Sequence, residues 1–260
     1  MFRCPKCKAP LIRKGVTYTC VNHHCYDCAK SGYVNLSMSQ KKLRGDDKMM
    51  IQARSRFLSH GYYEPLQKTL MTELCKIRPF FLIDAGCGQG YYTNAMSEHL
   101  PDCEIYGFDL SKFALKTAAK GNGNVHYAVA SVAQMPLPDA CADGIVSIFA
   151  PLYEQEMNRL LKLGGEIIRI GPGPYHLWEL KQALYDQVYK NNAPAPLSSF
   201  MLRKEIMVDY SVAIVDPQDL QALFLMTPYV YRTARNKAEQ LKERQFDTMR
   251  LQFHMEIWQK

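Results

Sequence analysis

The sequence predicts an α/β fold, a doubly wound parallel sheet with helices on both faces, preceded by a small module that binds a metal ion. Two observations carry this prediction. Of the nine cysteines in the 260-residue chain, five lie within the first 28 residues, together with two histidines. From residue 80 onward, short apolar runs alternate with amphipathic helical patterns, which is typical of a parallel sheet covered by helices. We therefore expect one full domain behind a small N-terminal module.

Composition and charge restrict the classes of protein to which the chain can belong. No apolar run approaches the ~18 residues that a membrane span needs, and the opening MFRCPKCK lacks the apolar segment of a secretory signal. We therefore expect a cytoplasmic protein with no membrane partner. Thiols stay reduced in that compartment, so closely spaced cysteines indicate a metal site rather than disulfides. The net charge of +7, from 32 Lys plus Arg against 25 Asp plus Glu, favours a polyanionic partner.

The N-terminal module is predicted from its ligand spacing. Cys4 and Cys7 form a C-x-x-C pair, and Cys20 opens a second group after a hairpin-like segment at residues 11–19. Two tight turns of this kind can bring four ligands around a tetrahedral Zn²⁺. A segment so short cannot bury enough surface to fold unaided, so the zinc would be structural and would supply folding free energy. Spacing alone leaves the fourth ligand open among His23, His24, Cys25 and Cys28.

The first strand of the larger domain is expected at residues 80–83, and a glycine-rich loop follows it. Gly86, Gly88 and Gly90 precede a helical pattern that runs to about residue 100. Glycines let a backbone adopt positive φ and approach a ligand closely. The loop lacks the G-x-G-x-x-G spacing of a dinucleotide fold. With Asp84 two residues ahead of it, it resembles the first motif of S-adenosylmethionine-dependent methyltransferases, in which the acid and the loop amides contact the amino acid moiety of the cofactor.

The following elements agree with such a cofactor site. A second strand ends at Asp109, which stands 109 − 90 = 19 residues beyond Gly90 and is placed to accept hydrogen bonds from two ribose hydroxyls. Further strands are expected at residues 125–130 and 144–149, then a helix that stops at Gly164-Gly165, then a fifth strand. The ligand of such a sheet binds outside the carboxyl ends of its strands.

Both parts together resemble one family. A zinc module placed directly before an S-adenosylmethionine domain, with the joining segment YDCAKSGYVNL, resembles the RlmA-type bacterial 23S ribosomal RNA guanine-N1 methyltransferases. The likeness continues through MIQARSRFL, HGYYEPL, DAGCGQGYYT, IFAP, GPGPYHLWELK and LMTP, nearly end to end. It implies a Rossmann-like class I methyltransferase domain, with S-adenosylmethionine and Zn²⁺ as cofactors and 23S ribosomal RNA as the partner. Relatives also suggest a homodimer.

The resemblance further implies roles for individual residues. The zinc ligands it implies are Cys4, Cys7, Cys20 and His24, although a small shift of the turn would let Cys25 replace His24. The cofactor contacts it implies are Tyr63, Gly88, Gln89 and His176. Gln89 departs from the family pattern, which is often acidic at this position. With the loop and the second acid, the full predicted cofactor set is Tyr63, Asp84, Gly86, Gly88, Gln89, Gly90, Asp109 and His176.

The expected division of the chain is a zinc-binding RNA-recognition module at residues 1–36, a basic helical linker at 37–60 and a methyltransferase domain at 61–260. Because phosphate contacts set much of the affinity for RNA, the basic residues of the first fifty positions are expected to contact it, unless they form only a solvated loop. These are Lys6, Lys8, Arg13, Lys14, Lys30, Lys41, Lys42, Arg44 and Lys48. A guanine splayed out of a hairpin could stack on Tyr26, Tyr33 or Tyr153.

The chemistry leaves the general base open. Guanine N1 carries a proton at neutral pH, so its attack on a methyl carbon needs a proton acceptor or stabilisation of the charge that builds on O6. Candidate bases are Asp109, Glu154, Glu156 and His176, and we assign none of them, because each has another expected role. Two other functions remain open from the sequence: a methyltransferase acting on a small molecule, and a non-catalytic RNA-binding protein that retains the fold.

Overall fold

The computed structural model describes the whole chain except residues 39–46, 122–123 and 242–243. Its N-terminal part is a small antiparallel sheet in the order β1-β2-β3. The hairpin expected at residues 11–19 forms the first two strands, which pair from Ile12 and Thr19 to Lys14 and Thr17. The strands are β1 (Ile12–Lys14), β2 (Thr17–Thr19) and β3 (Cys25–Asp27).

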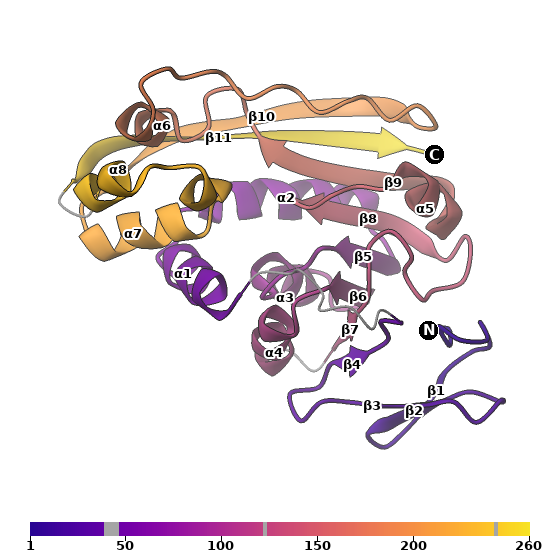
Figure 1. Ribbon diagram of the computed structural model, residues 1–260. Helices are drawn as coiled ribbons and strands as arrows, with labels where there is room; N and C mark the ends of the chain where they lie inside the picture. The colour runs from indigo at the N-terminus through magenta and orange to yellow at the C-terminus, as the bar shows by residue number, and fades with distance from the viewer. Residues whose placement is uncertain (39–46, 122–123, 242–243) are drawn as a thin grey trace.

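The remainder of the chain is built on one eight-stranded sheet in the order β10-β11-β9-β8-β5-β6-β7-β4 (Figure 1). Strand β5 pairs in parallel with β6 on one side and with β8 on the other, so the strand order reverses beside β5. Strands β4 to β9 are parallel, and β11 and β10 add antiparallel at one edge. The doubly wound α/β fold predicted from the sequence is confirmed. The strands are β4 (Val34–Asn35), β5 (Phe81–Ala85), β6 (Glu104–Asp109), β7 (Val125–Val129), β8 (Ala142–Ile148), β9 (Leu161–Pro172), β10 (Met201–Ile214) and β11 (Phe246–Gln259).

Both faces of this sheet are buried at its central strands β5 and β8, where neighbouring residues of a strand point to opposite sides. Leu82 packs in the core that the helices α1 to α4 cover, whereas Ile83 packs in a second core with α5 and the N-terminal module. No helix in the described residues is long and apolar enough to cross a membrane. The helices are α1 (Lys48–Ser59), α2 (Glu64–Ile77), α3 (Tyr91–His99), α4 (Lys112–Gly121), α5 (Glu154–Leu160), α6 (Trp178–Leu184), α7 (Pro217–Leu225), the 3-10 turn η1 (Pro228–Tyr231) and α8 (Arg235–Gln240).

The N-terminal module shares the core of the larger domain. Phe2 is 2% exposed, and its ring meets those of Tyr106 and Phe108 edge-on, with centroids 5.0 Å and 6.0 Å away. The chain then leaves the module through β4, which is the edge strand of the main sheet and pairs in parallel with β7. The boundary expected at residue 36 thus follows a strand of the main sheet, and the division at residues 36 and 60 stays a prediction.

One expected helix end differs from the structure. The helix expected to stop at Gly164-Gly165 ends at Leu160, because Leu161 already has extended backbone and begins β9. The two glycines serve the strand instead. Gly164 has a φ of 81°, and a Cβ on Gly165 would lie 3.0 Å from the Asp143 carbonyl oxygen, so this position lets β9 approach its neighbour closely.

Candidate cofactor and metal sites

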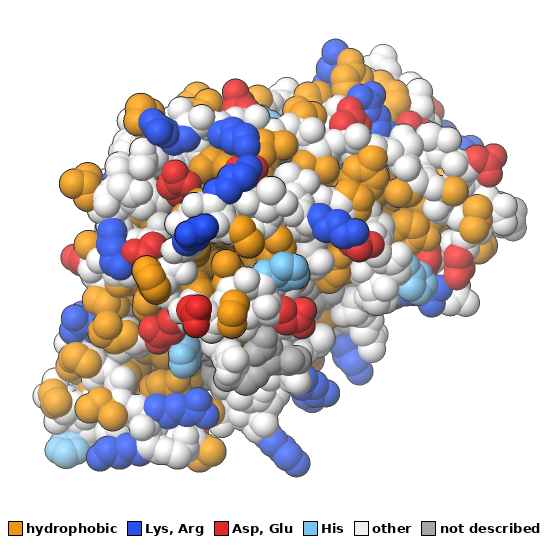
Figure 2. Space-filling view, turned by 180° about the vertical axis from the view of Figure 1, so that it is seen from behind, with side chains coloured by type: hydrophobic (Ala, Val, Ile, Leu, Met, Phe, Trp, Pro, Cys, Tyr) orange, Lys and Arg blue, Asp and Glu red, His pale blue; other side chains and the backbone are white. Residues whose placement is uncertain are grey.

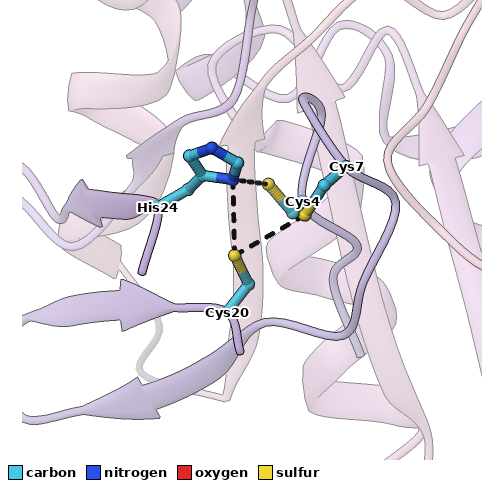
Figure 3. A group of neighbouring side chains, drawn as sticks. All are labelled: Cys4, Cys7, Cys20 and His24. Carbon is cyan, nitrogen blue, oxygen red and sulfur yellow. Dashed lines mark hydrogen bonds between the residues drawn. The ribbon is translucent and has the colours of Figure 1, made fainter. Parts of the chain in front are cut away.

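Four side chains of the N-terminal module point toward one another (Figure 3). The donor atoms of Cys4, Cys7, Cys20 and His24 all lie within 4.8 Å of one another. The Nδ1 atom of His24 is 3.4 Å from Cys4 Sγ and 3.5 Å from Cys20 Sγ, and the Sγ atoms of Cys7 and Cys20 are 3.7 Å apart. A tetrahedral zinc with ligand bonds of about 2.3 Å has donor separations of roughly 3.8 Å, so this donor set fits zinc.

Local turns create this arrangement. The amide of Lys8 donates to the Cys4 carbonyl, and the amide of His23 donates to the Cys20 carbonyl, which closes a tight turn after each cysteine. Both Lys8 and His23 adopt positive φ, 61° and 59°. The second turn decides between the alternative fourth ligands, because it directs His24 into the cluster.

Cys25 lies outside that cluster. Its Sγ atom is exposed and contacts the Thr19 hydroxyl and the His23 carbonyl, each at 3.6 Å. The structure therefore brings His24 and not Cys25 to the other three donors. Tyr26, expected as a stacking surface, instead places its hydroxyl 3.3 Å from Cys4 Sγ, where it can donate to a thiolate.

The glycine loop joins β5 to α3 and lies over the carboxyl end of β5. The amides of Gly86 and Cys87 both donate to the Phe108 carbonyl, at 2.9 Å and 3.0 Å. A Cβ on Gly86 would come within 2.4 Å of Ala150 Cβ, whereas a Cβ on Gly88 would meet only the Arg54 Nη1 atom, at 3.7 Å. Gly86 thus serves internal packing, and Gly88 leaves space beside the loop, as a cradle for a ligand requires.

The two predicted acids lie on either side of this loop. Asp84 is buried below it and accepts a 2.6 Å hydrogen bond from the Thr93 hydroxyl. Burial raises the pKa of Asp84 to about 7. Asp109, at the end of β6, accepts hydrogen bonds from the amides of Gly88 at 3.0 Å and Ser111 at 2.7 Å. The structure therefore brings both acids to the loop, as the sequence predicts.

Tyr63 and His176 come together from distant parts of the chain. The Tyr63 hydroxyl lies 3.4 Å from His176 Nε2. The backbone amide of Gln252 donates a hydrogen bond to His176 Nδ1 over 3.3 Å. Because Nδ1 accepts, the proton of the neutral ring sits on Nε2 and faces the tyrosine oxygen. Burial lowers the pKa of His176 to about 3, so the ring stays neutral.

Gln89 holds a helix against the loop. With its amide oriented to satisfy both groups, its nitrogen donates to the Ile51 carbonyl at 3.2 Å and its oxygen accepts from the Ser55 amide at 3.1 Å. Helix α1 is thereby docked onto the loop, which brings Arg54 beside Gly88. Sequence reasoning missed Arg54, although it lies within the MIQARSRFL segment, because nothing local marks which face of α1 meets the loop.

The two remaining candidate bases have structural contacts elsewhere. Glu154 accepts hydrogen bonds from the Ser198 hydroxyl and the Ser199 amide. Glu156 is buried, accepts from the Met135 amide at 2.6 Å and pairs with Arg159 at 2.7 Å. These carboxylates fix the loops around α5.

The five described residues of the module that are expected to contact RNA phosphates are exposed: Lys6, Lys8, Arg13, Lys14 and Lys30. Figure 2 shows Lys and Arg side chains projecting along the lower edge of the molecule, where the module lies. Lys48 is exposed at the start of α1, and Tyr153 is exposed while Tyr33 is partly buried. Lys41, Lys42 and Arg44 lie outside the described residues.

Comparisons with known proteins match both parts of the chain. Residues 2–43 match the zinc-ribbon family model described as "RlmA, N-terminal", and residues 82–170 match the model "Methyltransferase domain". The chain is 36% identical to the 23S rRNA (guanine(748)-N(1))-methyltransferase of Streptomyces fradiae over 188 residues, 70% of this chain and 67% of that protein.

Two further likenesses are longer. The chain is 31% identical over 260 residues to the Bacillus subtilis protein named "Putative 23S rRNA (guanine-N(1)-)-methyltransferase YxjB", which covers 94% of this chain and 91% of that protein. Among solved structures, geranyl diphosphate methyltransferase with bound S-adenosylmethionine is 13% identical and superposes with a TM-score of 0.47, covering 83% of this chain and 91% of that one.

Proposed function

Because this chain belongs to the RlmA-type family of 23S rRNA (guanine-N1)-methyltransferases, we propose that it methylates the N1 atom of a guanine in a hairpin of 23S ribosomal RNA. The observation that carries this proposal is the union of a zinc-ribbon donor set and a methyltransferase glycine loop in one chain. The glycine loop alone is compatible with many methyl acceptors. The zinc ribbon is the part that relates the chain to enzymes acting on ribosomal RNA.

We propose that the cofactor lies along the carboxyl ends of β5 and β6. When bound, S-adenosylmethionine supplies a methyl group made electrophilic by the sulfonium. Asp109 would hold its ribose, and the buried Asp84 would offset the charge of its ammonium group from below the loop. Arg54, whose guanidinium stands beside the open space at Gly88, would pair with its carboxylate.

The remaining residues of the proposed cofactor site shape the loop and the space around the ligand. Gly86, Gly88 and Gly90 give the loop its positive φ angles, and Gln89 fixes α1 over it. Tyr63 would present its hydroxyl proton to the ligand, because its oxygen faces the Nε2 proton of His176. These interactions orient the reactants and exclude water, which can supply much of the rate enhancement in methyl transfer.

The geometry argues against each of the four candidate bases. His176 uses Nδ1 to accept the Gln252 amide, and its Nε2 atom carries the proton. Asp109 accepts two backbone amides, and Glu154 and Glu156 hold loops around α5. We therefore assign no general base to the reaction.

We propose a structural zinc bound by Cys4, Cys7, Cys20 and His24, because four protein ligands complete the tetrahedron. The exposed cations of the module would contact RNA phosphates. The proposed compartment is the cytoplasm. A homodimer is proposed from the family resemblance alone, and sedimentation of the zinc-loaded protein would test it.

The function is tested by mapping methylated guanines in 23S ribosomal RNA. RNA from a strain that lacks the gene should lose one N1-methylguanine, and the wild-type gene should restore it. A matched Asp109→Asn gene should restore it poorly, because the amide offers one acceptor atom in place of two. The same map identifies the target nucleotide.

Two results would favour the alternative functions. An unchanged methylation map together with methyl transfer to a small acceptor would indicate a small-molecule enzyme. RNA binding without measurable affinity for S-adenosylmethionine would indicate a non-catalytic binding protein.

A further inference from the structure

Phe149 has a strained backbone at the carboxyl end of β8. Its φ is 53°, in the left-handed region that bulky residues rarely adopt. The surrounding structure holds it there, because the Phe149 amide donates to the Ile170 carbonyl at 2.9 Å and the Ser147 hydroxyl donates to the Ala150 carbonyl at 3.3 Å. Strain maintained in this way is concentrated at functional sites in proteins.

The ring of Phe149 is the outward member of a cluster of four rings. The rings of Tyr63, His176 and Phe253 lie 6.5 Å, 6.0 Å and 5.9 Å from it, centroid to centroid. All three are buried, whereas Phe149 is 46% exposed. An apolar ring held rigidly against a buried cluster, with nearly half of its surface open, offers a flat surface for another ring.

Its position in the sheet relates this surface to the cofactor loop. Strand β8 is the direct neighbour of β5, on the side where the strand order reverses. Ala150, the next residue, packs closely on Gly86. A Cβ atom added to Gly86 would lie 2.4 Å from Ala150 Cβ. Phe149 therefore borders the crevice at the strand ends where doubly wound sheets bind their ligands.

We propose that Phe149 is the stacking surface that positions the target guanine for methyl transfer. The proposal rests on the proposed function, since it assigns the purine acceptor of that reaction. A guanine splayed out of its hairpin is no longer stacked on its neighbours, and an aromatic ring at the rim of the site replaces that interaction. The left-handed backbone turns the ring outward from β8, which explains why the strain is retained.

The test uses three variants of the full-length, zinc-loaded protein. Phe149→Asn removes the ring while tolerating the left-handed backbone, and Phe149→Tyr keeps the ring. Phe80→Asn is the matched control, because Phe80 is 75% exposed and precedes β5 at the opposite end of that strand. Affinity for S-adenosylmethionine is measured by calorimetry, and single-turnover methylation is measured on a transcript of the 23S hairpin.

Removal of one base–aromatic stack should slow methylation by Phe149→Asn about five- to 100-fold at subsaturating RNA. Its cofactor affinity should stay within about twofold of wild type, an order-of-magnitude bound for a residue that does not contact the cofactor. Phe149→Tyr and Phe80→Asn should both methylate at the wild-type rate. A hairpin with 2-aminopurine at the target position should lose fluorescence on binding to wild type and to Phe149→Tyr, but not on binding to Phe149→Asn.

Two outcomes would overturn the stacking role while leaving the proposed function intact. Phe149→Asn could methylate the hairpin as fast as wild type, or it could lose cofactor affinity by the same factor as rate, which would make Phe149 part of the cofactor site. A wild-type protein that transfers no methyl group to ribosomal RNA would overturn both proposals together.

Discussion

At the scale of single residues, Asp84 and His176 carry opposite pKa shifts within one site. Burial raises the pKa of Asp84 to about 7 and lowers the pKa of His176 to about 3. The stability linked to Asp84 is therefore complete below about pH 4 and is lost as pH rises through 7. The stability linked to His176 is complete above about pH 6.5 and is lost as pH falls toward 3.

These opposite slopes partly cancel in the wild type, and single variants should separate them. Relative to wild type without cofactor, Asp84→Asn should gain stability as pH rises from 5 to 7, and His176→Gln should gain stability as pH falls from 6.5 to 5. Each gain should approach about 1.4 kcal/mol per pH unit. Urea unfolding across this range measures both. Parallel pH profiles for wild type and His176→Gln would show that the imidazole is not buried as a neutral ring.

The zinc ligands allow a second prediction at this scale. His24→Ala should release zinc and unfold the module, because the remaining three ligands leave the metal open to water. Cys25→Ala should bind zinc as wild type does, since its Sγ atom lies outside the cluster. Competition with a chromogenic chelator measures both affinities. Normal zinc affinity in His24→Ala with weakened affinity in Cys25→Ala would reverse the assignment.

Single-residue roles could be predicted where the local pattern determines them. The spacing of Asp84, the loop glycines and Asp109 follows from the order of strand, loop and helix, and the structure places them together. The role of Gln89 could not be predicted, because its partners, Ile51 and Ser55, lie on a helix whose docking depends on tertiary packing. Phe149 likewise reads as an ordinary strand residue until its φ is known.

At the scale of elements, helix α1 is clamped to α7 across about 160 positions of sequence. Arg56 on α1 pairs with Asp219 at 2.6 Å and with Asp216 at 2.7 Å. The buried Asp219 also accepts from His60 at 2.6 Å and from the Tyr62 hydroxyl at 3.0 Å. Burial alone would raise the pKa of Asp219, but these hydrogen bonds outweigh it and hold the pKa below its usual value.

Removing that carboxylate should loosen α1. We expect Asp219→Ala to lower the free energy of unfolding by about 3 kcal/mol, because it leaves Arg56, His60 and Tyr62 without their shared acceptor. Affinity for S-adenosylmethionine should fall as well, since α1 carries Arg54 and leads to Tyr63. Glu64→Ala is the control. It breaks an exposed pair with Lys68 and should cost less than about 1 kcal/mol. Equal destabilisation of the two variants would exclude the clamp.

The contact between α1 and α7 could not be predicted from the sequence, although the helices themselves leave a local pattern. The helical character of the segment before residue 60 is visible in its sequence, and the described part contains α1. Its partner is not visible there, because Asp216 and Asp219 sit at the start of α7 and look like ordinary N-terminal helix acids. Contacts between residues so far apart in sequence arise from packing and leave no local pattern.

At the scale of the whole molecule, the N-terminal module is built into the main core. Its ligand spacing is enough to predict a metal site, but Phe2 gives no sign in the sequence that it packs on Tyr106 and Phe108. Deletion of residues 1–36 would uncover these rings and remove β4 from the edge of β7. A truncated protein would therefore lack both the cations that we propose to contact RNA and part of its core packing. Charge reversal separates the two effects, because exposed lysines contribute little to that core.

The last prediction uses such reversals to locate the RNA surface. Changing the exposed Lys6, Lys8 and Lys14 to Glu should weaken binding of the 23S hairpin. The slope of log affinity against log salt concentration should also become shallower, by roughly 0.7 to 0.9 for each phosphate that is no longer neutralised. The control triple changes Lys190, Arg235 and Lys237, away from the module, to Glu and gives the same net charge, 7 − 6 = +1. Elemental analysis should find one zinc in both proteins, and calorimetry should find unchanged affinity for S-adenosylmethionine. If the two triples weaken RNA binding equally, net charge rather than the zinc module accounts for binding.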